Sequence, residues 1–215
     1  MQITKLHQKY DELQLIHGDA ALTSIYGAGC VEHPKVMFIF MNPTGRNISA
    51  SKSWNGLRAP WLGTKIVWNI FYDVGFISLE HFTQTQSLTS KEWTESFAKS
   101  LYSELAENRV FITNLAKCTQ IDARPLKDSV FKDYLELMKE EISAINPEKI
   151  ITFGNQVSSI LLNTSISVSN YLNNEHETIE VDTTIFPVYP VHYPVGQGLR
   201  NMPLSIRRIR YILGV

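Results

Sequence analysis

The sequence predicts an α/β protein: a three-layer α/β/α fold with a central parallel sheet of about four strands. The first observation is that residues 36–41 form an unbroken apolar run, which is typical of a strand buried on both faces of a sheet. The second is that similar runs recur at 109–115 and 149–153, separated by segments of helical period. Strands that alternate with helices indicate right-handed parallel crossovers. We expect one domain over residues 1–215.

The segments around these strands have the apolar spacing of helices that pack on a sheet. Helices are expected at residues 1–26, 66–74, 91–106, 130–145, 156–162 and 203–213. Gly75 and the pair Asn146-Pro147 are suited to helix ends, and Pro203 is suited to a first helical turn. Residues 78–87 have weak strand and turn character instead.

Three further segments are less regular. Residues 185–191 are strand-like, but Pro187 and Pro190 predict an edge position or a short strand, because proline donates no amide hydrogen bond. Residues 163–182 are polar and compatible with an irregular hairpin. The polar segment 47–64 is long for a loop, which favours either a binding loop or a mobile lid.

The composition is that of a globular protein without a strong overall charge. The net charge of −1 provides no global attraction to nucleic acid or to an anionic membrane, although a local basic patch is compatible with it. Cys30 and Cys118 are too few for a disulfide scaffold or a cysteine-only metal site. Since we see neither an apolar leader nor a long apolar span, we expect a cytoplasmic protein that does not enter a membrane.

Polar loops follow the strands, and in a parallel sheet they meet at one edge, where ligands bind. These loops span residues 42–46, 114–119, 154–156 and 192–200. They contain amides, an imidazole, glycines and cations without clustered carboxylates, which argues against a metal site built on Asp and Glu and against a paired-carboxylate glycosidase. We find neither a nucleophile elbow nor a Walker loop. Amides and backbone N–H groups suit recognition of a heterocycle and stabilisation of a developing anion.

Five segments, in order, resemble motifs of the uracil-DNA glycosylase superfamily, in its mismatch-specific and single-strand-selective branches. They are Met41–Gly45 (the Asn-Pro loop), Ala59–Gly63 (similar to Pro-Phe-x-Gly), Val110–Cys118 (similar to a strand ending in Thr-Asn-x-x-Lys-Cys), Pro147–Gly154, and Val191–Arg200 at the place of a His-Pro-Ser loop. The first motif has Phe40 in place of a glycine and Thr44 inserted, and the last reads His-Tyr-Pro-Val-Gly. The four cysteines of the iron–sulfur branch are absent.

The resemblance implies a DNA glycosylase of the uracil-DNA glycosylase type, without metal or cofactor, that acts on an extruded base during base excision and DNA repair. Asn42 would position a water and His192 would donate a hydrogen bond to the base, so these two are the expected catalytic residues. Trp61, Asn114 and Tyr193 would bind the base, Trp61 by stacking and Asn114 through its amide. Flanking phosphates would lie against Thr44, Gly45, Gly196, Gly198 and Arg200. The partner would be single- or double-stranded DNA, and we expect a monomer.

Each main candidate also has a structural interpretation. Asn42 is suited to capping the turn at Pro43, and Trp61 to packing within its loop. Asn114 is suited to bonding neighbouring backbone groups, and His192 to a buried position beside tyrosines. The altered last motif keeps a second hypothesis open, a module of the same fold that binds a nucleotide or nucleic acid without cleaving it. A third hypothesis is an N-glycosidase that acts on free nucleosides.

Overall fold

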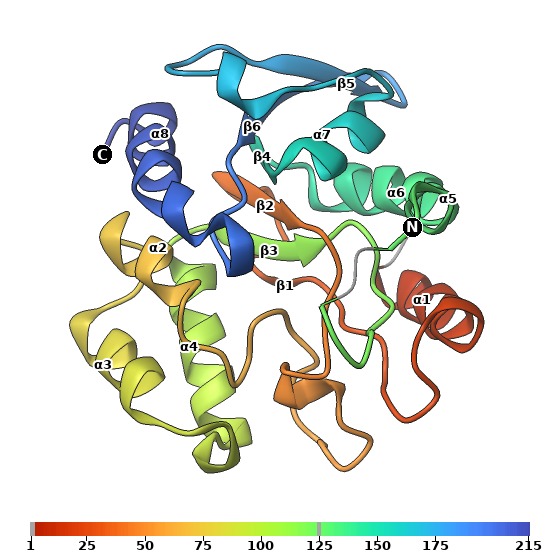
Figure 1. The fold of residues 1–215 in the computed structure, drawn as a ribbon, viewed down its shortest axis with the longest axis vertical. Coiled ribbons are helices and arrows are strands. Elements are labelled where there is room, and N and C mark those ends of the chain that lie inside the picture. The colour runs from red at the N-terminus through yellow and green to blue at the C-terminus, as the bar shows by residue number, and fades with distance from the viewer. Residues whose placement is uncertain (1–2, 124–125) are drawn as a thin grey trace.

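The computed structural model describes residues 3–123 and 126–215 and contains a six-stranded sheet in the order β1-β3-β2-β4-β6-β5 (Figure 1). The four central strands run parallel: β3 (Val110–Asn114), β2 (Val36–Phe40), β4 (Ile150–Phe153) and β6 (Thr184–Val191). Antiparallel strands flank them on both sides: β1 (Ala28–Gly29) and β5 (Glu177–Val181). The predicted α/β class with a parallel centre is confirmed, and the two edge strands are additional to it.

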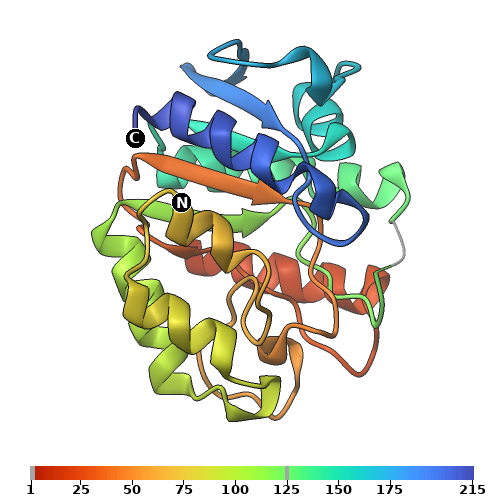
Figure 2. The same ribbon diagram turned by 60° about the vertical axis from the view of Figure 1, so that its left-hand side comes forward.

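Helices cover both faces of the sheet, as the two views in Figures 1 and 2 show. One face carries α2 (Trp68–Asp73), α4 (Glu95–Glu107) and α8 (Met202–Leu213), with α3 (Leu79–Ser87) outside α2. The other face carries α1 (Ile3–His17), α5 (Asp128–Asp133), α6 (Leu135–Ile145) and α7 (Asn155–Leu162). Short 3₁₀ helices are η1 (Ile48–Ala50), η2 (Ser90–Glu92), η3 (Val168–Asn170) and η4 (Gly196–Asn201).

The two hydrophobic clusters explain why β2 has no polar residue. Phe38 and Phe40 contribute to the cluster under α2, α4 and α8, whereas Met37 and Ile39 contribute to the cluster under α1 and α5–α7. All of β2 is inaccessible to solvent, which confirms the prediction that this strand is covered on both faces.

The predictions for three segments need correction. Residues 79–87 form α3 rather than a strand or turn, because Ser78 caps the helix by accepting a hydrogen bond from the His81 N–H at 3.3 Å. The expected helix at 130–145 is divided at Tyr134 into α5 and α6. The helix expected at 1–26 ends at His17, and residues 1 and 2 of that prediction lie outside the described ranges. Within α1, the expected apolar positions Leu15 and Ile16 are exposed, and the buried residues are Leu6, Tyr10 and Gln14.

The prediction for 185–191 is also wrong in part, because β6 lies between two strands and is eight residues long. Its prolines are tolerated because each faces a paired neighbour on one side only. Pro187 pairs with β5 and precedes the segment that pairs with β4, whereas Pro190 pairs with β4 beyond the end of β5. The main-chain carbonyl of Pro190 accepts a hydrogen bond from Nε of Arg208 at 2.9 Å.

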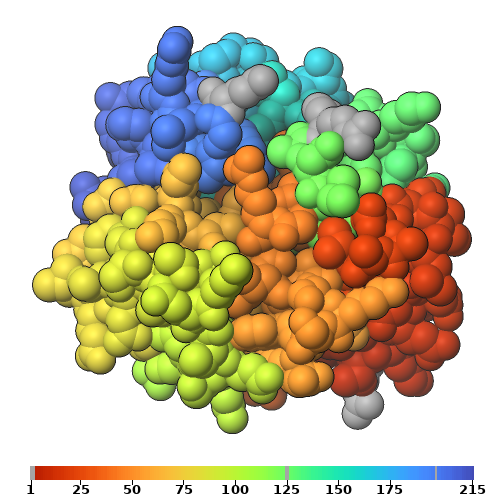
Figure 3. Space-filling model, turned by 60° about the horizontal axis from the view of Figure 1, so that its bottom comes forward, coloured from red at the N-terminus to blue at the C-terminus, as the bar shows by residue number. Residues whose placement is uncertain are grey.

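The four parallel strands bring their carboxyl ends to one edge of the sheet, and the long segment 47–64 lies against this edge (Figure 1). In the space-filling view, this segment (orange) occupies the middle of one face, between N-terminal (red), central (yellow-green) and C-terminal (blue) parts of the chain (Figure 3). Among the described residues, no helix is both long and apolar enough to span a membrane.

Candidate functional site

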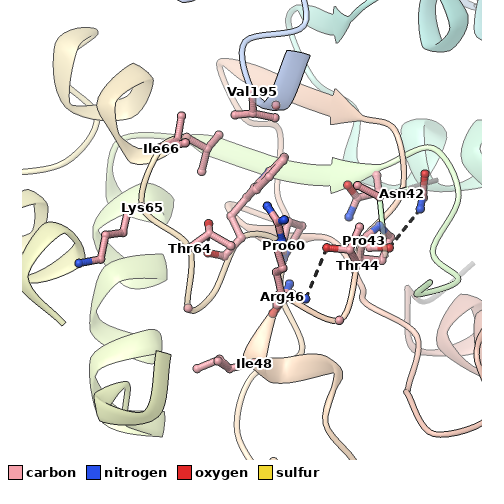
Figure 4. A pocket seen from close by; sticks show the side chains of 18 of the residues that line it. Asn42, Pro43, Thr44, Arg46, Ile48, Pro60, Thr64, Lys65, Ile66 and Val195 are labelled. Atoms are coloured by element: carbon pink, nitrogen blue, oxygen red, sulfur yellow. Dashed lines mark hydrogen bonds between the residues drawn. The ribbon is translucent and has the colours of Figure 1, made fainter. Parts of the chain in front are cut away.

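A cavity of about 660 Å³ opens where the strands end. Its walls come from the loop after β2, the segment 60–67, the end of β3 and the loop after β6. Figure 4 shows Asn42 and Thr44 on one side, Thr64 and Ile66 on the other, and Val195 above them. Of the residues predicted from the sequence, those that line it are Asn42, Thr44, Gly45, Trp61, Asn114, Tyr193 and Gly196.

Asn42 and Asn114 come together because their strands are neighbours. Asn114 is in register with Phe40, and the N–H of Leu115 donates to the carbonyl of Phe40 at 2.8 Å. Nδ2 of Asn42 donates to the carbonyl of Pro43 at 3.1 Å, which is the turn contact expected of a structural asparagine. For Oδ1 of Asn42, no hydrogen bond is found within the described residues, so this oxygen is available to a ligand.

Two polar atoms of the cavity wall are buried without a hydrogen-bond partner among the described residues: Nε1 of Trp61 and Nδ2 of Asn114. Asn114 is 2% exposed. Buried amides are nearly always paired in folded proteins. The structural interpretation, in which this side chain bonds neighbouring backbone groups, therefore does not account for Nδ2.

Trp61 has an unusual backbone conformation. Its φ of +66° lies in the left-handed region, which side chains of this size rarely adopt. The conformation is held from both sides: the Thr64 Oγ1 donates to the Trp61 carbonyl at 2.7 Å, and the Tyr102 hydroxyl donates to the Pro60 carbonyl at 2.5 Å. The indole meets the ring of Phe40 edge-on, with centroids 4.9 Å apart. Such strained residues cluster at functional sites.

The loop after β6 places Tyr193, and not His192, in the cavity wall. Burial raises the pKa of Tyr193 to about 12, so the phenol is protonated and can donate a hydrogen bond at neutral pH. Burial, and secondarily the nearby Arg208 charge, lower the pKa of His192. The main-chain carbonyl of His192 accepts a hydrogen bond from the Ser205 hydroxyl of α8 at 2.8 Å.

Two of the amides predicted to contact phosphate are already used within the protein. The N–H of Gly45 donates to the carbonyl of Gln120 at 2.7 Å, and the N–H of Gly198 donates to the carbonyl of Val195 at 3.0 Å. A Cβ at Gly198 would come within 1.9 Å of the Tyr193 carbonyl oxygen, so this glycine allows the turn itself. These two N–H groups are therefore already paired within the protein, and the phosphate contacts of Gly45 and Gly198 stay a prediction.

The other predicted phosphate contacts differ in position. Thr44 and Gly196 line the cavity, whereas Arg200 is exposed and does not line it. Two cations that the sequence analysis did not select, Arg46 and Lys65, do line it. Lys65 points away from the cavity in Figure 4 and donates to the carbonyl of Gln86 at 2.5 Å, which leaves Arg46 as the nearer cation. Arg46 directly follows the Asn-Pro-Thr-Gly turn in the sequence, and this position is the signal by which it could have been predicted to line the cavity.

Within the described ranges, the His, Cys, Asp and Glu side chains form no group of three or more placed to hold a metal ion. A search among curated proteins found no match to this chain. The family model described as "Uracil DNA glycosylase superfamily" matches residues 26–198, which include every residue of the cavity wall. This match covers well over half of the chain and agrees with the α/β sheet and with the position of the cavity at its carboxyl edge. The protein therefore belongs to the uracil DNA glycosylase superfamily.

Proposed function

We propose that the protein is a DNA glycosylase that hydrolyses the N-glycosidic bond of uracil or a related damaged base. One observation supports this most directly: residues from four separate segments, Asn42, Trp61, Asn114 and Tyr193, line a single cavity that contains an unpartnered buried amide. Membership of the superfamily is consistent with base excision from DNA. DNA with an extruded base is the proposed partner, and a monomer is the proposed state.

The cavity suits a flat heterocycle. Trp61, braced by Phe40, provides an aromatic surface, and the proposed role of its strained backbone is to hold the indole where a base can stack. The carboxamide of Asn114 provides both a donor and an acceptor for the edge of the base. Binding a base would give its buried Nδ2 the partner that it lacks.

In the proposed reaction, Oδ1 of Asn42 orients a water molecule toward the sugar C1′. The C1′–N bond breaks with its electron pair remaining on the base, the water oxygen bonds to C1′, and the proton released from the water ends on the base. An amide is too weak a base to drive this step, so stabilisation of the charged transition state is the main contribution. We assign the hydrogen bond to the departing base to the hydroxyl of Tyr193, since His192 does not line the cavity.

The test is release of free base from single- and double-stranded oligonucleotides that contain uracil. We expect abasic product with the wild-type protein and its loss, by about 100-fold or more, in Asn42→Ala. Asn174→Ala, which removes an exposed amide outside the cavity, is the matched control and should keep full activity. Free deoxyuridine tested in parallel distinguishes a nucleosidase from an enzyme that requires DNA.

The placement of His192 outside the cavity wall favours one alternative, a module that binds a nucleotide or nucleic acid without cleaving it. Saturable binding of the same oligonucleotides, with no abasic product and no effect of Asn42→Ala, would support that alternative and refute the glycosylase proposal.

A further inference from the structure

A buried ion pair contacts the main chain of Asn114. Lys117 is fully buried, and its Nζ donates to the main-chain carbonyl of Asn114 at 2.6 Å and to Oε2 of Glu141 at 2.6 Å. It also donates to the hydroxyl of Thr113. Glu141, on α6, is only 1% exposed, so both charges of the pair are removed from water.

Stability alone is a weak reason to keep such a pair. Removing two charges from water costs several kcal/mol each, and apolar residues of similar size often stabilise a protein equally well. Burial lowers the pKa of Lys117, and the carboxylate of Glu141 opposes that shift. From α1, the ring of Tyr10 lies 5.1 Å from Nζ. His7 is also on α1, and its pKa is lowered by burial first, then by the charge of Arg58 and, to a smaller extent, that of Lys117.

Of the two charges in the pair, the ammonium lies nearer the cavity wall. Glu141 reaches β3 from α6, and the ammonium of Lys117 lies between this carboxylate and the carbonyl of Asn114. The positive end of the pair is therefore the end next to the cavity wall. In a site with little water, a fixed positive charge interacts more strongly with a developing anion than it would in solution.

We propose that Lys117, held by Glu141, is a positioning residue that fixes Asn114 in the cavity wall and favours the anionic form of the departing base. This inference rests on the proposed function. It assigns to one ion pair two effects, orientation of the amide and electrostatic stabilisation, and neither requires Lys117 to touch the substrate.

Two variants test the role of the charge in catalysis. In Lys117→Met/Glu141→Leu, both charges are replaced together so that no unpaired charge is left buried. We expect its kcat for base release to fall by about 10- to 100-fold, less than the loss of a direct donor, with a small change in KM. The matched control is Lys139→Met/Glu136→Leu. It removes a surface ion pair on α6, the helix that carries Glu141, with Nζ and Oε1 2.7 Å apart, and should be fully active.

The pH profile separates this role from a purely structural one. Glu141→Gln removes the carboxylate that raises the pKa of Lys117, so the ammonium will lose its proton at a lower pH. The alkaline limb of the kcat/KM profile should then move to lower pH. Adding Lys117→Arg to the Glu141→Gln variant should move that limb back toward higher pH. A loss of packing without an electrostatic role would lower the melting temperature and leave the limb in place.

Binding of a free base completes the test. We expect wild-type protein, titrated with 5-fluorouracil across the ionisation of its ring N–H, to prefer the anion, and Lys117→Met/Glu141→Leu to lose that preference. A folded double variant with wild-type kcat and an unchanged preference would overturn the inference alone. A wild-type protein that prefers the anion but releases no base would overturn the proposed function alone, and one that neither binds nor releases a base would overturn both.

Discussion

Replacing Asn114 with leucine should make the protein more stable and inactive. The residue is 2% exposed, and its Nδ2 has no partner among the described residues, so the folded protein bears the desolvation cost of an unpaired amide. Leucine has the same branching at Cγ and no polar group to desolvate. The variant cannot hydrogen-bond the edge of a base, so base release should be lost.

The size of the stabilisation follows from that unpaired group. A buried donor without a partner costs about 1–3 kcal/mol, and Asn114→Leu should raise the free energy of unfolding by roughly the lower end of this range. For a chain of this length, 1 kcal/mol corresponds to a rise of about 2–4 °C in the melting temperature.

Asn47 provides a matched control, because it is a second buried asparagine in the same cavity wall. Its Nδ2 donates to the carbonyl of Ala59 at 2.7 Å, and its Oδ1 accepts from the N–H and the hydroxyl of Ser49 at 3.0 and 2.8 Å. Asn47→Leu should therefore destabilise the protein by about 2–4 kcal/mol. Urea denaturation at pH 7 measures both variants. If Asn114→Leu lowers the free energy of unfolding by more than about 1 kcal/mol, the amide of Asn114 is hydrogen-bonded in the wild-type protein and the reasoning is refuted.

Three further predictions follow from other contacts. Trp61→Ala should reduce kcat/KM by about 5- to 150-fold, since stacking on one base contributes about 1–3 kcal/mol; an unchanged value would place the base elsewhere. Burial lowers the pKa values of His7 and His192 from 6.5, so the unfolded chain takes up protons before the folded one, and the free energy of unfolding should fall as the pH drops below 6.5. His7→Gln/His192→Gln should flatten that decline in denaturation at pH 5–7, and an equally steep decline would contradict it. Arg208→Leu should lower the free energy of unfolding by about 3–5 kcal/mol, because this 4% exposed guanidinium donates to three main-chain carbonyls; a loss below 1 kcal/mol in urea would show that water replaces them.

The central fold could be predicted because its signals are local and strong. The apolar runs at 36–41, 109–115 and 149–153 each form a parallel strand, since a run without alternation has no face to expose. The edge strand β5 lies in the segment 163–182, for which the sequence indicates no more than an irregular hairpin. The polar residues of β5 are not buried, and Ile179 and Val181 alone give the strand a short apolar pattern. The position of β6 depends on which proline lies beside which neighbour, and this is a property of register that its own sequence does not contain.

Part of the candidate site could likewise be predicted from the sequence, and part could not. Asn42 and Asn114 could be selected because each lies at or just beyond the carboxyl end of a buried parallel strand, and such ends meet at one edge. Lys117 stands between Ala116 and Cys118, and a lone charge in such a position is a detectable signal for a buried ion pair. Its partner Glu141 lies 24 residues later in the chain, on α6, whereas Lys117 lies in the loop after β3, so no spacing rule connects them.

The sequence by itself determined the alternation of buried strands and helices, and with it the edge at which polar loops collect. The tertiary structure alone decided which of the adjacent residues His192 and Tyr193 lines the cavity, which amides are already bonded, and that the amide of Asn114 is not. The physical reason is that hydrophobic burial is recorded residue by residue along the chain, whereas hydrogen-bond satisfaction depends on partners that only the folded chain brings within about 3 Å.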